Sequence, residues 1–279
     1  MQILTADHFT FEQLTEAYNQ TRVDYLIPMP MNVARLREYA HAYDVDLSCS
    51  CVAVDETNML GLGMLGLRDR RSWITRLGVL PSGRRRGVGN TIMEALVGKS
   101  EEKGVDAIWL EVIAGNTPAH ELFRKFGFIE TRELIVARRP PNPDTAVSLP
   151  GIKQVTTLDH EEAIILLSHR KKRPNWLNET ESLQNTRNLS ALLVELENGG
   201  RGWITYHASL FQLTRILVEV TAGNSIEVTE ACLNVLHQRH LRQDAKTENI
   251  FDDEQWQGYQ KAGYIESFRR IEMVKKLKE

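Results

Sequence analysis

Residues 84–89 read Arg-Arg-Arg-Gly-Val-Gly, a basic turn spaced by glycines, and this stretch decides the fold. The segment before it, residues 73–79, is rich in β-branched and aromatic residues, which favours a strand. After it, Val88 and Ile92 begin a helical repeat that runs to Gly104, a residue suited to the position just past a helix end. The basic turn is therefore predicted to lie at a helix N-terminus.

A helix N-terminus at this place is suited to bind an anion. Its first backbone N–H groups have no partner within the helix, and the helix dipole adds positive charge. Gly87 and Gly89 carry no side chains that would block a close ligand. Two nucleotide-binding loops do not fit, because the complete Walker pattern is absent at this turn and Ile92 stands where a dinucleotide fingerprint needs a small residue.

A second motif follows a predicted buried strand at residues 106–113. In residues 116–128 the sequence is Asn-Thr-Pro-Ala-His-Glu-Leu-Phe-Arg-Lys-Phe-Gly-Phe. Thr117 can cap a helix there, Pro118 suits its first position, and Gly127 suits its end. The apolar residues of this helix form one stripe.

In this order, the two motifs resemble those of the GNAT superfamily of N-acetyltransferases. The pattern Arg-x-x-Gly-x-Gly is similar to the acetyl-CoA loop of that family, and residues 116–128 are similar to its second signature, with Phe123 in place of a tyrosine. The resemblance covers residues 1–139 and implies a mixed α/β sheet of the GNAT type. It implies acetyl-CoA as co-substrate, bound by Leu77, Val79, Arg84, Arg85, Arg86, Gly87, Val88, Gly89, Asn90, Asn116 and Phe123.

The resemblance also implies a mechanism, in which a neutral amine attacks the thioester directly in one complex with acetyl-CoA. The protein supplies positioning, a base, and an N–H donor for the oxyanion. In the family this donor lies on the strand before the loop, where Gly78 would permit a bulge or serve only for packing. Glu111 is the expected base, because alternation places it with Trp109 and Ile113, where desolvation raises the proton affinity of a carboxylate.

Two features of this catalytic prediction stay open. The first is the role of Glu111. The ribosomal-protein alanine acetyltransferases of the family carry a similar Leu-Glu-Val strand, in which the glutamate is the base. If Glu111 is instead salt-bridged or exposed at a sheet edge, its role is purely structural. Phe123 has no proton to give where many family members place a tyrosine that protonates the leaving thiolate. Tyr25 is a candidate substitute, and Asp24 and Tyr25 belong to a segment that usually lines the acceptor pocket in the family.

Composition bounds the class of protein. The 279 residues suffice for about two domains, with 42% hydrophobic and 25% charged residues as in a soluble globular protein. A net charge of −3 gives no attraction for nucleic acid. No apolar run reaches the roughly 20 residues of a membrane span, and the first residues do not read as a signal peptide, so we expect a cytoplasmic protein without a membrane partner.

Histidines and cysteines give no metal site in the sequence. Cys49 and Cys51 lie on a predicted strand, Ser48 to Asp55, and are expected in the core. His237 and His240 lie one turn apart on a predicted helix, but no further ligand follows at metal-binding spacing, so a solvated helix face is expected.

The chain is predicted to contain two domains. Residues 140–150 include the densest proline stretch and are predicted to form a linker between a GNAT domain (1–139) and a second domain (151–279). The second half repeats the plan of strands, helix, strand, helix and strand, but its strand-to-helix junction at residues 220–225 is short and has one glycine and no arginine. We therefore expect a degenerate GNAT-like domain without a CoA loop.

The sequence thus predicts an N-acetyltransferase that moves an acetyl group from acetyl-CoA to a primary amine of a small molecule or peptide, with a homodimer as one possible assembly. Two other functions stay open. The fold can serve as a CoA-binding or sensory module without turnover, or as an acyltransferase on a thiol-type metabolite, since the tandem architecture resembles that of mycothiol synthase.

Overall fold

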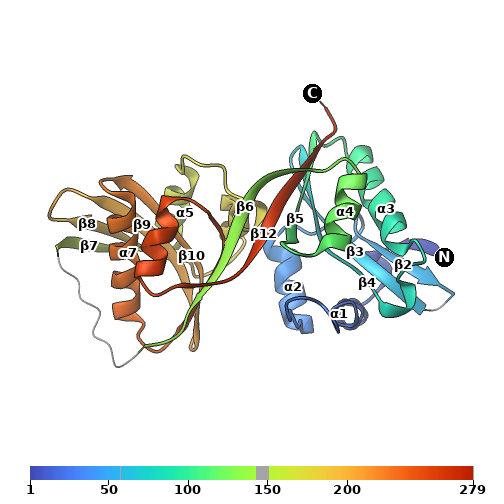
Figure 1. Ribbon diagram of the computed structural model, residues 1–279, viewed down its shortest axis with the longest axis horizontal. Helices are drawn as coiled ribbons and strands as arrows, with labels where there is room; N and C mark the ends of the chain where they lie inside the picture. The colour runs from blue at the N-terminus through green and yellow to red at the C-terminus, as the bar shows by residue number, and fades with distance from the viewer. Residues whose placement is uncertain (57, 143–150, 279) are drawn as a thin grey trace. The chain divides into compact units, whose positions relative to one another are not determined.

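The computed structural model describes residues 1–56, 58–142 and 151–278 (Figure 1). The chain divides into two compact units. Unit 1 comprises Met1–Arg132 and Ile271–Glu279, and unit 2 comprises Glu133–Arg270. The strands β6 (Ile129–Arg139) and β12 (Ile265–Lys276) each contribute residues to both units. The last strand of the chain therefore returns to the unit that the first half of the sequence forms.

Unit 1 contains a mixed sheet with the order β1-β2-β3-β4-β5-β12. The first four strands pair antiparallel, and β4 pairs parallel with β5. The backbone N–H of Leu277 donates to the carbonyl of Asp106 (2.8 Å), just before β5. The elements of unit 1 are β1 (Gln2–Thr5), η1 (Ala6–His8), α1 (Phe11–Gln20), α2 (Val33–Ala42), β2 (Cys51–Asp55), β3 (Asn58–Arg68), β4 (Arg71–Val79), η2 (Pro81–Gly83), α3 (Val88–Glu102), β5 (Ala107–Ile113) and α4 (Thr117–Lys125).

Helices cover both faces of the unit 1 sheet, and the alternation of each strand decides which core a residue enters. In β2, Val52 and Val54 pack with α1 and α2, whereas Cys51 and Ala53 pack with α3 and α4. Cys49 lies in the turn before β2 and enters the same core as Cys51. A capping box between Thr10 and Gln13 begins α1.

Unit 2 repeats this plan with the strand order β6-β11-β10-β9-β8-β7. The strands β7 to β10 pair antiparallel, β10 pairs parallel with β11, and β11 pairs antiparallel with β6. Helices α7 and α8 pack on one face of the sheet, and α5 and α6 pack on the other. The remaining elements are β7 (Ile152–Leu158), α5 (His160–Ser168), η3 (Trp176–Asn178), α6 (Thr180–Gln184), β8 (Ser190–Leu196), β9 (Arg201–Ala208), β10 (Gln212–Ala222), α7 (Ser225–Arg239), β11 (Asp244–Phe251) and α8 (Glu254–Lys261).

The mixed α/β sheet predicted from the sequence is confirmed, and so are most of its elements. The division into units differs from the predicted domains 1–139 and 151–279, because β6 and β12 are shared. Of the predicted linker 140–150, residues 143–150 lie outside the described residues. The sequence prediction left residues 151–190 unassigned, although Asp159 and Glu162 form a capping box at the start of α5.

Candidate active site

The N-terminus of α3 is open in unit 1. Its N-cap residue is Gly87, in the left-handed region with φ 80°, and no side chain caps the helix. The first backbone bond into the helix runs from the N–H of Thr91 to the carbonyl of Gly87 (3.1 Å), so the N–H groups of Val88, Gly89 and Asn90 have no partner in the helix ladder. These donors suit an anionic group, because anions bind at such helix ends.

Two of the three arginines in this loop are held by carboxylates. Arg84 donates to both oxygens of Asp24, with Nη2 2.6 Å from Oδ1, and Arg86 donates to Asp55 (2.8 Å). The hydrogen bonds from these arginines hold the pKa values of Asp24 and Asp55 below their ordinary range. Arg85, at φ 59°, is exposed and makes no hydrogen bond or ion pair with the described residues. Arg85 is therefore the arginine available to a ligand.

A bulge interrupts β4 just before the loop. The ladder with β3 pairs Gly78 with Leu62 and then Thr75 with Met64, so its register shifts between them. The residue in the left-handed region is Arg76, with φ 52°, rather than the predicted Gly78. Gly78 is needed for packing, because a Cβ atom there would lie 2.5 Å from the hydroxyl of Thr21. The predicted bulge is thus present, but Arg76 forms it.

The pairing of β4 with β5 ends at Ile74, just before this bulge. The two parallel strands pair from Arg71 with Ala107 to Ile74 with Leu110. Leu77 and Val79, both half-buried, follow on β4, and the carbonyl of Leu77 accepts a hydrogen bond from Arg22 (3.1 Å).

Glu111 lies on β5 beside an aromatic cluster. Ile108, Leu110 and Val112 face the core, whereas Glu111 is half-buried on the other face of the strand. The indole N–H of Trp73 donates to Glu111 Oε2 (3.1 Å). The ring of Tyr43 lies 5.8 Å from that of Trp73, and a third ring completes the cluster: Tyr39, 4.7 Å from Tyr43 and 6.2 Å from Trp73. The carboxylate is thus oriented by a donor in largely aromatic surroundings.

Asn116 and Tyr25 meet at the start of α4. Asn116, rather than the predicted Thr117, caps this helix by accepting from the N–H of Ala119 (3.4 Å), and its amide donates to the hydroxyl of Tyr25 (3.0 Å). Phe123, on the same helix, is only 6% exposed and packs in the core, 6.3 Å from the ring of Phe128. A role of Phe123 in cofactor binding stays a prediction.

The sequence did not indicate the contacts that two arginines make with tyrosines of unit 1. Arg76 lies 4.1 Å over the ring of Tyr39 and donates to the hydroxyl of Tyr18 (3.2 Å). Arg22 lies 4.0 Å over the ring of Tyr25. The contact of Arg76 with Tyr18 spans 58 positions, and no local sequence pattern predicts it.

Unit 2 has the same bulge but a closed helix N-terminus. Arg215 on β10 has φ 54°, at a register shift like that of Arg76. The N-cap of α7 is Asn224, whose side chain accepts from the N–H groups of Ile226 (3.1 Å) and Glu227 (3.0 Å). The donors that are open in α3 are therefore occupied in α7.

The histidine pair of α7 differs from the prediction. His237 is fully buried and shares a hydrogen bond of 3.0 Å with the hydroxyl of Tyr264, so the prediction of a solvated helix face is wrong for it.

Residues 1–56, 58–142 and 151–278 contain no group of three or more metal-ligating side chains. None of their helices is long and apolar enough to span a bilayer.

Residues 11–128 of the chain match the family model described as "Acetyltransferase (GNAT) family". "Probable N-acetyltransferase san" of Drosophila melanogaster is 30% identical over 114 residues, 40% of this chain and 57% of that protein. The "[Ribosomal protein bS18]-alanine N-acetyltransferase" of Salmonella typhimurium is 34% identical over 90 residues, 32% of this chain and 50% of that protein. The chain thus spans about half the length of these curated relatives.

Two solved structures share the fold along nearly the entire chain. A GCN5-related N-acetyltransferase from Sphaerobacter thermophilus has a TM-score of 0.71 at 14% identity, covering 99% of this chain and 94% of its own. A tandem GNAT protein from the clavulanic acid biosynthesis pathway has a TM-score of 0.64 at 13% identity, covering 99% and 98%. The tandem GNAT-like fold predicted from the sequence is therefore confirmed.

Proposed function

We propose that unit 1 is an acetyl-CoA-dependent N-acetyltransferase in which a primary amine attacks the thioester within a ternary complex. The observation that carries this proposal is the uncapped N-terminus of α3 at Gly87. The half-buried Glu111 on β5, the neighbour of the strand that leads into this helix, supports it. The names of the relatives, both N-acetyltransferases, support the same reaction class.

The loop residues would bind the phosphates of acetyl-CoA. The open N–H groups of Val88, Gly89 and Asn90 suit the pyrophosphate, and Arg85 adds a cation without losing a partner. Arg84 and Arg86 can join only by exchanging their carboxylates for phosphate oxygens. Because Asp24 lies in the segment between α1 and α2, this exchange would release that segment on the acceptor side.

Glu111 would remove the proton from the amine as the C–N bond forms and the C–S bond breaks. The indole of Trp73 donates to Oε2 of Glu111 and so orients the carboxylate for this role. Tyr25 would protonate the thiolate that leaves. Its hydroxyl accepts from Asn116, so its own hydrogen stays available for donation, which the phenyl ring of Phe123 cannot offer.

The cofactor is proposed to bind unit 1 alone, since Asn224 occupies the helix N–H groups of unit 2. The acceptor is an amine of a small molecule or peptide, and its identity is the object of the test. CoA release from acetyl-CoA would be measured with pooled amines, peptides and aminoglycosides against a blank without acceptor, in the parent chain and in Glu111→Gln.

Release with one pool, lost in Glu111→Gln, is the expected result and names the acceptor class. No release with any pool, while acetyl-CoA still binds, would replace the proposal by a CoA-binding module. Release that needs a thiol acceptor or a longer acyl group would replace it by a different acyltransferase.

A further inference from the structure

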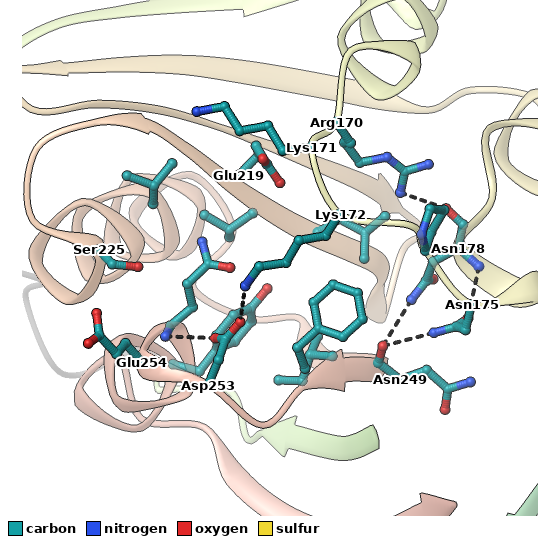
Figure 2. Close-up of a pocket in the computed structure, with 18 of the residues that line it drawn as sticks. Arg170, Lys171, Lys172, Asn175, Asn178, Glu219, Ser225, Asn249, Asp253 and Glu254 are labelled. Atoms are coloured by element: carbon teal, nitrogen blue, oxygen red, sulfur yellow. Dashed lines mark hydrogen bonds and ion pairs between the residues drawn. The ribbon is translucent and has the colours of Figure 1, made fainter. Parts of the chain in front are cut away.

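A cavity of about 400 Å³ opens in unit 2 where β10 and β11 part (Figure 2). These parallel strands pair at Gln212 with Asp244 and at Leu213 with Ala245, and the cavity lies farther along, toward their carboxyl ends. Its volume falls within the range of about 300–1,000 Å³ that small ligands occupy. Its apolar wall is formed by Trp203, Leu217, Val218, Val220, Ile250 and Phe251.

Charged side chains of both signs line this cavity. Figure 2 shows Arg170 and Lys171 on one side and Asp253 and Glu254, at the start of α8, on the opposite side. Lys172 crosses to Asp253 and forms an ion pair with it, so these two charges neutralise each other. Two cations and two carboxylates then remain for a ligand: Arg170, Lys171, Glu219 and Glu254.

Arg170 is a fixed cation whose hydrogen-bond partners are neutral. Its guanidinium donates to the carbonyls of Leu167 (2.9 Å) and Asn178 (2.7 Å) and to the hydroxyl of Thr180 (3.3 Å). A guanidinium has five N–H donors, so two remain. Burial lowers the pKa of Arg170 to about 10, and the group stays charged at neutral pH. A carboxylate in the cavity would give this cation the bidentate partner that it lacks.

Glu219 is the complementary anion. It lies between Val218 and Val220 on β10, half-buried, and forms no hydrogen bond or ion pair with the described residues. Both Glu219 and Arg170 line the cavity, and Figure 2 shows Glu219 on the same side of it as Lys171 and Arg170. A partly desolvated carboxylate without a partner favours a bound cation.

The chemistry of the cavity differs from that of a CoA site. The junction between β10 and α7 is short, and Asn224 occupies the N–H groups that a pyrophosphate would need. The balance of two cations and two anions over an apolar wall suits a small zwitterion instead.

We propose that this cavity binds a free α-amino acid with an apolar side chain. The carboxylate of the ligand pairs with Arg170, its ammonium group pairs with Glu219, and its side chain packs on the wall that includes Val218 and Phe251. Lys171, at the exposed rim, adds attraction for the carboxylate. The inference involves neither acetyl transfer nor unit 1, so it stands or fails independently of the proposed function.

In the first test, a series of amino acids and their derivatives is titrated into the parent chain without acetyl-CoA, and binding is measured by isothermal titration calorimetry. Leucine, isoleucine, valine, methionine and phenylalanine are compared with their methyl esters and N-acetyl derivatives. Binding of at least one amino acid, with a Kd at least about tenfold lower than that of either derivative, is expected, because each derivative removes one charge. No heat at about 10 mM of any amino acid, where even a Kd of about 1 mM is visible, would overturn the proposal.

A second test uses matched variants with the amino acid that binds. Glu219→Gln, which keeps shape and removes charge, should raise the Kd at least about tenfold, whereas Glu197→Gln, at an exposed glutamate of unit 2 that does not line the cavity, should change it by less than about twofold. Equal binding of the N-acetyl derivative would mean a plain anion site, and equal binding of the ester would mean a cation site. Either result would contradict the zwitterion, even if Glu219→Gln failed to fold.

Discussion

The burial of His237 makes the stability of the chain depend on pH in a way that one substitution should remove. Burial, and then the charges of Arg139 and His240, lower the pKa of His237 to about 3 from its ordinary value of 6.5. Nε2 shares a hydrogen bond with Tyr264, and Nδ1 has no hydrogen-bond partner among the described residues. The folded chain therefore keeps this imidazole neutral.

The direction of this pH dependence follows from the pKa values of His237 in the unfolded and the folded chain. Between about pH 6.5 and pH 3 the unfolded chain binds a proton at His237 that the folded chain does not, so stability falls as the pH falls through this window. From pH 7 to pH 5 the loss is about 2 kcal/mol for this one group, from the ratio of the two proton-binding equilibria.

The assay is urea unfolding followed by tryptophan fluorescence at pH 7 and pH 5. His237→Gln should be less stable at pH 7, because it loses ring packing, but it should lose about 2 kcal/mol less than the parent between the two pH values. His41→Gln, a change at an exposed imidazole, should keep the pH dependence of the parent. If His237→Gln does not fold, His237→Phe takes its place in the same comparison, because it also lacks the titrating imidazole. The same pH dependence in parent and both His237 variants would refute the reasoning.

Four further outcomes are expected in unit 1. Glu111→Gln should lower turnover by about 10²- to 10⁴-fold and leave the Kd of acetyl-CoA within about twofold; unchanged turnover would remove the glutamate from the mechanism. Tyr25→Phe should slow CoA release with acetyl-CoA more than with an acyl donor whose leaving thiol is more acidic, and equal effects would exclude an acid role. Arg85→Ala should weaken CoA and dephospho-CoA alike, since we assign it to the pyrophosphate; a larger loss for CoA would assign it to the 3′-phosphate. Asp24→Asn should tighten CoA binding by about two- to fivefold at low salt by freeing Arg84, and no change would mean that this ion pair does not compete with the cofactor.

The parts of the fold that the sequence predicted depend on local signals. Gly104 and Gly127 lie in the left-handed region just past the ends of α3 and α4, as their positions in the sequence predicted. Local signals of the same kind predicted the bounds of α3 and β5 to within one or two residues of those in the structure. The Arg-x-x-Gly-x-Gly turn could therefore be placed at a helix N-terminus from the sequence alone.

The parts that the sequence did not predict depend on distant contacts. Arg84 meets Asp24 across 60 positions, and the burial of His237 depends on Tyr264, 27 positions further along. The return of β12 to unit 1 is a pairing of chain ends, which no periodicity reports. Arg76 adopts the left-handed conformation without being glycine, because the register shift in β4 imposes it.

The cavity of unit 2 could not be predicted from the sequence for the same reason, because it depends on contacts between distant segments. Its charges come from the loop after α5, from β10 and from the start of α8, and only the fold brings these three segments together. Residues 170–172 read in sequence as an ordinary basic loop.

The central claim is that this chain binds acetyl-CoA once, at the open N-terminus of α3. Isothermal titration of acetyl-CoA into the full chain, with Arg85→Ala and Asn224→Ala as paired variants, tests it most directly. We predict one site per chain, weakened about tenfold in Arg85→Ala and unchanged in Asn224→Ala, which lies at the start of α7. Two sites per chain, no binding, or a loss confined to Asn224→Ala would contradict the account.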